Sequence, residues 1–198
     1  MNKKIKRNHI LLSALRVFAR KGYRRATIKD VAKEAGIGKS TIYEYFSSKI
    51  ELFRELVDFL FTDLEEKAFS SLDPFSTPPE QLCSIVQSFS NYMSSLPFGD
   101  NSHAITLDIF SESVRSGIVD LRPVYTREIQ GLKAIIEHGI TQKYFRNDID
   151  PEHIVSIIIA FMDGILIQWL VLPDLVDIRE RSEEFCRLLI DGLKPQSG

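Results

Sequence analysis

The sequence has few of the residues that build disulfide scaffolds or metal centres. Among its 198 residues only Cys83 and Cys186 are cysteines, and they belong to no CxxC motif or Cys/His cluster. Disulfide frameworks and structural zinc sites need more thiols at closer spacing, so we expect two free thiols in a reducing compartment. For Cys83, a buried structural thiol is favoured, and a redox role remains the alternative. We expect no metal and no cofactor.

The motifs of common enzyme classes are also missing. The chain contains no P-loop, GxGxxG, HExxH or GxSxG pattern and no repeated ExxH. Its four histidines form no HxxxH pair, which favours solvated or capping positions over metal ligation. The sequence therefore predicts a protein that is not an enzyme.

Long uncharged apolar runs are scarce. Only residues 154–172 approach the composition of a membrane span, and Asp163, Gly164 and Gln168 interrupt that run. A charged side chain at the centre of a bilayer costs about 2.5 to 3.5 kcal/mol, so burial against other protein segments is favoured. The basic N-terminus lacks a small-residue cleavage site and predicts a helix rather than a signal peptide. We expect a cytoplasmic protein with no membrane partner.

Acidic residues are absent before Asp30, and this absence reveals an uneven charge distribution. The whole chain has 25 Lys and Arg against 27 Asp and Glu, a formal net charge of -2. Residues 1–49 nevertheless hold 13 of the basic side chains and only three acids. Such an asymmetry indicates a basic segment that faces nucleic acid or a membrane, followed by an acidic one.

Apolar residues recur at helical spacing along nearly the whole chain, and no segment shows the alternation of a half-buried strand. The pattern predicts an all-α protein of about nine helices. Capping residues, Gly22, Gly36 and the Pro-rich segment 72–81 mark several helix ends. The expected helices cover approximately residues 3–20, 28–35, 38–46, 48–70, 78–95, 102–116, 120–141, 151–171 and 176–193.

Residues 27–49 have the layout of a helix-turn-helix, in which the second helix lies in the DNA major groove. At about 100° per residue, Ile42 and Phe46 share a face that packs against the preceding helices. Ser40 and Glu44 point the opposite way. The outward face is small and polar, and it is therefore suited to enter a groove.

We expect different side chains to contact bases and phosphates. Lys39 can reach guanine O6 and N7 or a phosphate from the first turn of the second helix. Thr27 and Ser48–Lys49 lie at helix N-termini, which favour phosphate, and the Tyr43 hydroxyl can donate to phosphate. The remaining basic residues would release counterions from DNA, with a merely solvated tail as the alternative: Lys3, Lys4, Lys6 and Arg7.

Residues 7–53, with AGIGKSTIYEYFSSKIELF at their centre, resemble the N-terminal domain of the TetR family of bacterial transcriptional regulators. The resemblance implies an all-helical homodimer that binds a palindromic double-stranded DNA operator, usually as a repressor, and whose C-terminal domain binds a small inducer. Gly38, Glu44 and Ile50 depart from the family pattern and leave the operator sequence open. The DNA-contacting positions that the resemblance implies are Thr27, Lys39, Ser40, Thr41, Tyr43, Tyr45 and Lys49.

Two domains follow from this reading: residues 1–49 as the DNA-binding domain, its last helix continuing to about residue 70, and residues 50–198 as the effector-binding and dimerisation domain. Residues 106–170 are similar to C-terminal domains of part of the same family. The helix over 151–171 and the face of 186–193 are expected to form a four-helix bundle with the partner chain.

A cavity between the middle helices is expected to bind a hydrophobic or amphipathic effector, such as an acyl derivative or a drug. The same aromatic and Met residues also fit a plain core, and that alternative is strong. A ligand-independent activator or architectural DNA-binding protein is the alternative function; it differs by lacking a small molecule that weakens operator binding. The candidate lining residues are Phe89, Met93, Asp108, Ile109, Phe110, Tyr125, Phe161, Met162 and Trp169, with Gln87 and Glu112 as further polar contacts.

Overall fold

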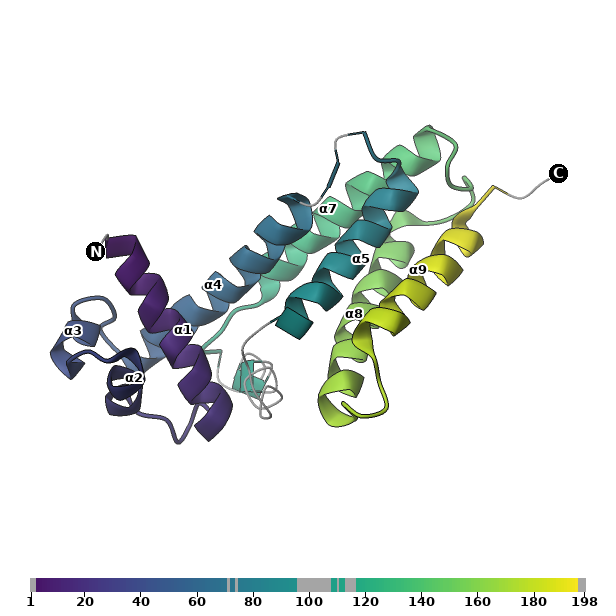
Figure 1. Cartoon of the computed structure of the whole chain (residues 1–198). Helices are drawn as coiled ribbons and strands as arrows, with labels where there is room; N and C mark the ends of the chain where they lie inside the picture. Colours follow the sequence, from purple (N-terminus) through teal and green to yellow (C-terminus); the bar gives the residue numbers. More distant parts are fainter. Residues whose placement is uncertain are drawn as a thin grey trace. The chain divides into compact units, whose positions relative to one another are not determined.

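The computed structural model of the chain describes residues 3–70, 72–73, 75–95, 108–109, 111–112 and 117–195. Every regular element within these ranges is an α-helix, which confirms the predicted fold class (Figure 1). The helix expected over residues 102–116 falls largely outside the described residues. The helices are α1 (Lys3–Lys21), α2 (Ile28–Ala35), α3 (Lys39–Tyr43), α4 (Lys49–Ser70), α5 (Pro78–Ser95), α7 (Arg122–Thr141), α8 (Pro151–Val171) and α9 (Ile178–Leu193).

The chain forms two compact units. Unit 1 consists of Met1–Asp63 and Pro97–Leu121, and unit 2 consists of Leu64–Leu96 and Arg122–Gly198. The passage from unit 1 to unit 2 therefore lies inside α4 rather than at its start. The reason is that the first turns of α4 belong to the core of unit 1, where Leu52, Phe53 and Leu56 are buried.

The ends of α2 follow from its sequence. The Thr27 hydroxyl accepts a hydrogen bond from the Asp30 amide at 3.2 Å, and the Asp30 carboxylate accepts one from the Thr27 amide at 2.9 Å. This reciprocal pair is the capping box that Thr27 and Asp30 predict. The helix closes at Gly36, whose φ of 66° is left-handed and favours glycine.

Helix α3 is shorter than the spacing predicts. It ends at Tyr43, and Phe46 enters the core from the turn that follows. Its N-cap, Gly38, makes no side-chain hydrogen bond. A helix of five residues with no side-chain cap has little stability of its own, so packing against its neighbours must hold it.

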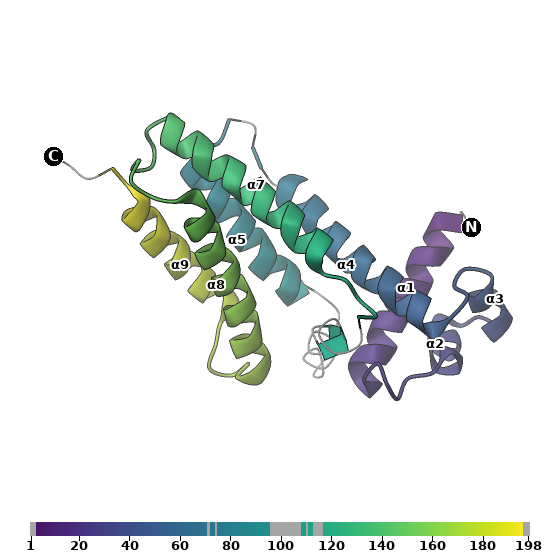
Figure 2. The same ribbon diagram turned by 180° about the vertical axis from the view of Figure 1, so that it is seen from behind.

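Unit 2 is a bundle in which α5, α7, α8 and α9 lie side by side in both views (Figure 1, Figure 2). Helix α8 is long and apolar enough to cross a membrane by composition alone. In the structure its inner side, with Ile158, Met162 and Leu166, lies in a core shared with α5, α7 and α9. Burial against protein thus accounts for one side of the apolar run of residues 154–172, while Ile157 and Val171 on another side are exposed.

Candidate nucleic-acid interface

A closely packed core supports the outward face of α3. Ile42 and Phe46 are almost completely buried, as their shared face predicts. Close by in sequence and structure, the rings of Phe18, Tyr23 and Phe53 form a cluster: Phe18 lies edge-on to the other two at 5.7 Å, and the Tyr23 and Phe53 centroids are 4.2 Å apart. These aromatic contacts belong to the same compact unit as α3 and help to hold its core together.

The opposite side of α3 is exposed and polar. Lys39, Ser40, Tyr43 and Glu44 are exposed, and Thr41 is half-buried. The Tyr43 side chain is 46% exposed although it is aromatic. The Lys39 ammonium lies 5.5 Å from the centre of the Tyr43 ring, so a cation–π contact links the two candidate DNA contacts.

The remaining predicted DNA contacts lie on either side of α3. Thr27 is exposed at the start of α2, and its hydroxyl is already bonded to Asp30 at 2.8 Å. Tyr45 is half-buried, with the Lys6 ammonium 6.0 Å from its ring. Lys49 donates to the Arg24 carbonyl at 3.1 Å, and burial lowers its pKa. In the free protein Lys49 is therefore held by its own chain.

Several basic residues of this region are held by carboxylates. Glu34 accepts hydrogen bonds from Arg16 at 2.9 Å and Arg20 at 2.8 Å, and these guanidinium groups lower the pKa of Glu34. The Lys21 ammonium lies 2.6 Å from Asp30, and the bonds from Lys21 and Thr27 lower the pKa of Asp30 to about 2. These carboxylates therefore stay ionised at neutral pH and fix the positions of neighbouring cations.

Two carboxylates proposed as effector contacts have other partners in the structure. Asp108 accepts a hydrogen bond from the Tyr23 amide at 2.5 Å, and Glu112 pairs with Arg24 at 2.9 Å. Both contacts lie within unit 1, beside the turn at Gly22, whose φ is 75°. No local sequence pattern indicates the contacts of Asp108 and Glu112, because each joins two residues that are far apart in sequence, by 85 positions for Asp108 and 88 for Glu112.

Two neighbouring effector candidates are not placed in unit 2 either. Ile109 is buried in unit 1, and Phe110 lies outside the described residues.

The other effector candidates lie together in unit 2. Phe89 and Met162 are buried members of one apolar cluster. Four further candidates are half-buried and pack against the same cluster: Met93, Tyr125, Phe161 and Trp169. Gln87, proposed as a polar contact, is exposed.

Unit 2 also contains a partly buried polar group next to this cluster. The Tyr125 hydroxyl donates to Asp163 at 2.8 Å, and burial raises the pKa of both side chains. On the same helix as Tyr125, burial and the nearby carboxylates of Asp163 and Glu65 raise the pKa of Glu128 to about 7. A carboxyl with this pKa is partly protonated at neutral pH, so it can donate as well as accept a hydrogen bond.

Comparisons with known proteins agree with this geometry. The family profile of bacterial regulatory proteins, tetR family, matches residues 10–56, and that of the tetracyclin repressor-like C-terminal domain matches residues 110–178. The uncharacterized HTH-type transcriptional regulator YhgD of Bacillus subtilis is 27% identical over 177 residues, covering 81% of this chain and 82% of its own. The fatty acid metabolism regulator protein of the same species is 26% identical over 203 residues, covering 96% and 97%.

A solved structure shares the fold over nearly the whole chain. The transcriptional regulator FadR of Bacillus subtilis, crystallised in complex with stearoyl-CoA, superposes with a TM-score of 0.78 at 22% identity. The match covers 94% of this chain and 98% of FadR.

Replacing Glu128 by Gln should change how stability depends on pH. The pKa of Glu128 rises from 4.5 to about 7 on folding, so the folded state is favoured while the carboxyl is protonated and loses that advantage as the pH rises through 7. The shift corresponds to roughly 3 kcal/mol. The Glu128→Gln side chain stays neutral, so the variant should become more stable relative to wild type as the pH rises from about 4.5 to 8. The difference in free energy of unfolding should approach this amount at the upper end, as measured by urea denaturation.

Glu137→Gln is the matched control, because Glu137 is exposed on the same helix. This control measures the effect of removing one carboxylate from an exposed position of α7, and the Glu128→Gln difference should exceed it by an amount that grows as the pH rises. A Glu128→Gln difference no larger than that of the control at every pH would contradict the raised pKa of Glu128.

Proposed function

Because this chain belongs to the TetR family of bacterial regulatory proteins, we propose that it is a homodimeric repressor that binds a palindromic operator in the cytoplasm and is released by a small hydrophobic effector. The observation that carries the proposal is the exposed polar face of α3 above the buried Ile42 and Phe46. This arrangement suits a helix that enters a major groove.

The proposed DNA contacts divide by chemistry. Lys39 and Ser40 present donors in the first turn of α3, where the side chains of a recognition helix meet base edges. The Tyr43 hydroxyl and the residues at the starts of α2 and α4 are assigned to phosphates, which set affinity and salt dependence. The full proposed set is Thr27, Lys39, Ser40, Thr41, Tyr43, Tyr45 and Lys49.

Dimer formation is supported by an exposed apolar stripe on α8. Ile157, Phe161 and Val171 recur along it at the spacing of one helix face, and Ile157 and Val171 are exposed. The ring of Phe161 stacks on Phe185 of α9 at 3.8 Å, and Leu188, also on α9, is 59% exposed. A helix pair of this kind can pack on its own copy about a two-fold axis. Two copies would then present two α3 helices to half-sites about 34 to 36 Å apart.

The effector is proposed to bind within unit 2, among the apolar cluster that includes Phe89, Met93, Tyr125, Met162 and Trp169. Their apolar character favours a hydrophobic or amphipathic ligand, with the Tyr125–Asp163 pair as a polar contact. The FadR structure with stearoyl-CoA supports an acyl derivative as the first class to test. Asp108 and Ile109 are left out of the proposal, because they belong to unit 1.

Substitutions at Lys39 and Tyr43 should separate base reading from phosphate binding. Lys39→Ala should relax preference at particular base pairs by about 1 to 3 kcal/mol. Tyr43→Phe keeps the ring beneath Lys39 and removes only the hydroxyl, so it should weaken binding to all sequences alike. The measurement is a set of dissociation constants for a duplex selected from a random library and for its single-base-pair variants, at two or more salt concentrations.

Lys194→Ala is the control for Lys39→Ala, because it removes the same charge from unit 2 and should leave DNA binding unchanged. If Lys39→Ala weakened every duplex by the same factor, Lys39 would bind phosphate and would not read bases.

Leu188→Arg should convert the dimer into a monomer, because it places a charge on the exposed apolar face of α9. Sedimentation equilibrium should show half the wild-type mass, and binding to the two-half-site duplex should fall. The same substitution at Ile129, which is 40% exposed on α7, is the control and should stay dimeric. A Leu188→Arg protein that still sedimented as a dimer would remove α9 from the interface.

Long-chain acyl derivatives should raise the melting temperature of the protein and lower its affinity for the selected duplex, with a coupling of about 1 to 3 kcal/mol. Phe89→Ala should reduce the thermal shift, measured against the melting temperature of the same variant without ligand. Stabilisation only by small hydrophilic metabolites would contradict a hydrophobic effector. A protein that bound its duplex equally with and without every stabilising ligand would be a ligand-independent regulator.

A further inference from the structure

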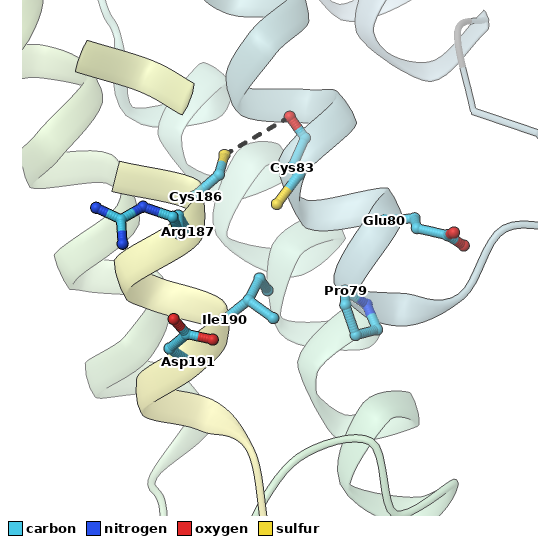
Figure 3. Close-up of a pocket in the computed structure, with 7 residues that line it drawn as sticks. All are labelled: Pro79, Glu80, Cys83, Cys186, Arg187, Ile190 and Asp191. Carbon is cyan, nitrogen blue, oxygen red and sulfur yellow. Dashed lines mark hydrogen bonds between the residues drawn. The ribbon is translucent and has the colours of Figure 1, made fainter. Parts of the chain in front are cut away.

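The two cysteines of the chain, far apart in sequence, meet at an open groove between α5 and α9 (Figure 3). The groove has a volume of about 340 Å³. Cys83 lies on its α5 side and Cys186 on its α9 side, 103 positions further along the chain. The other residues that line it are Pro79, Glu80, Arg187, Ile190 and Asp191.

The Cys186 side chain contacts Cys83. The Cys186 sulfur lies 3.9 Å from the carbonyl oxygen of Cys83, to which it donates. The nearby Cys186 thiol, a hydrogen-bond donor, also lowers the pKa of Cys83. Both cysteines are free in the structure. A disulfide requires two cysteines on neighbouring segments with their side chains directed toward each other, and the packed helices α5 and α9 place Cys186 against Cys83.

The environments of the two thiols differ in a way that assigns a role to each. Cys83 is half-buried at the groove, and the thiolate is the nucleophilic form of cysteine, so its lowered pKa favours reaction there. Cys186 is only 4% exposed, and its bond to Cys83 together with burial raises its pKa. Burial therefore shields it from an oxidant until Cys83 has reacted.

We propose that Cys83 and Cys186 form a reversible redox pair, in which a hydroperoxide oxidises Cys83 and Cys186 closes an intramolecular disulfide. In the first step the Cys83 thiolate attacks the peroxide, the O–O bond breaks, and Cys83 becomes a sulfenic acid while hydroxide or alkoxide leaves. In the second step the Cys186 sulfur displaces the sulfenic hydroxyl, with loss of its proton, and water is released. The two thiols lose two electrons in total, and the peroxide gains them.

The thiol of Cys186 lies on the side of α9 away from the apolar stripe. At about 100° per residue, Leu188 lies about 160° around α9 from Cys186. Ile190, which also lines the groove, lies about 40° from Cys186, whereas Asp191 at the edge of the groove lies about 60° from Leu188. The reaction stands on α5 and α9 alone and does not depend on DNA or on an effector.

The test treats the reduced full-length protein with graded hydrogen peroxide, then denatures it and blocks the remaining thiols with an alkylating reagent. Intact mass spectrometry should show a product about 2 Da lighter than the reduced protein, with neither thiol alkylated. On a non-reducing gel this product should migrate as a single chain, and dithiothreitol should restore both thiols. A disulfide between two chains, or a wild-type Cys83 that proceeds to sulfinic acid with Cys186 still alkylated, would overturn the proposal.

Single substitutions test the order of the two steps. In Cys186→Ser, peroxide should produce a sulfenic acid at Cys83 that dimedone traps. In Cys83→Ser, Cys186 should react at least about tenfold more slowly than Cys83 does in Cys186→Ser, because it is buried. Equal rates at the two cysteines would overturn the assignment of Cys83 as the nucleophile. Circular dichroism checks that each variant is folded; Cys186→Ala replaces Cys186→Ser if the hydroxyl disrupts the core.

Discussion

The burial of Ile42 and Phe46 is the interaction on which the exposed polar face of α3 depends. A five-residue helix cannot offset its own nucleation cost, and Gly38 supplies no side-chain cap. The position of α3 is therefore set by its packing on α2 and by the burial of Ile42 and Phe46 in the core of unit 1. Exposed side chains such as Ser40 can vary without loss of the fold, whereas Ile42 cannot. The buried face of this short helix thus holds its position, and the opposite face is the one proposed to read DNA.

The elements that sequence reasoning predicted well are those determined by neighbouring residues. Helical periodicity, the Thr27–Asp30 capping box and the glycine at position 36 are local, and each was confirmed. The contacts it missed join distant segments: Asp108 with Tyr23, and Cys186 with Cys83. Periodicity identifies which face of a helix is buried, but it does not identify the helix that covers that face. A charged residue between apolar ones, such as Asp108, therefore looks like a ligand contact until its partner is known.

The net charge counted over the first 49 residues overstates the positive charge of that region in the folded chain. Three acids stand among those residues in the sequence. In the folded chain, two further carboxylates from outside the segment join them, since Glu55 pairs with Arg7 and Glu112 pairs with Arg24. The positive electrostatic potential of this segment is accordingly lower than the count implies, and exposed cations such as Lys39 supply it on the face proposed to contact DNA. The position of a cation in the fold therefore decides whether it contributes to the surface potential, and the number of cations in the segment does not.

Because unit 1 is completed by Pro97–Leu121, the chain passes between the two units three times. A fragment that ended within α4 would lack Asp108 and Glu112, and with them the partners of the Tyr23 amide and Arg24. The DNA-binding unit is therefore not a module that can be cut from the chain and moved to another protein at one boundary. Gene fusions or domain exchanges that treat it as a continuous segment would leave part of it behind.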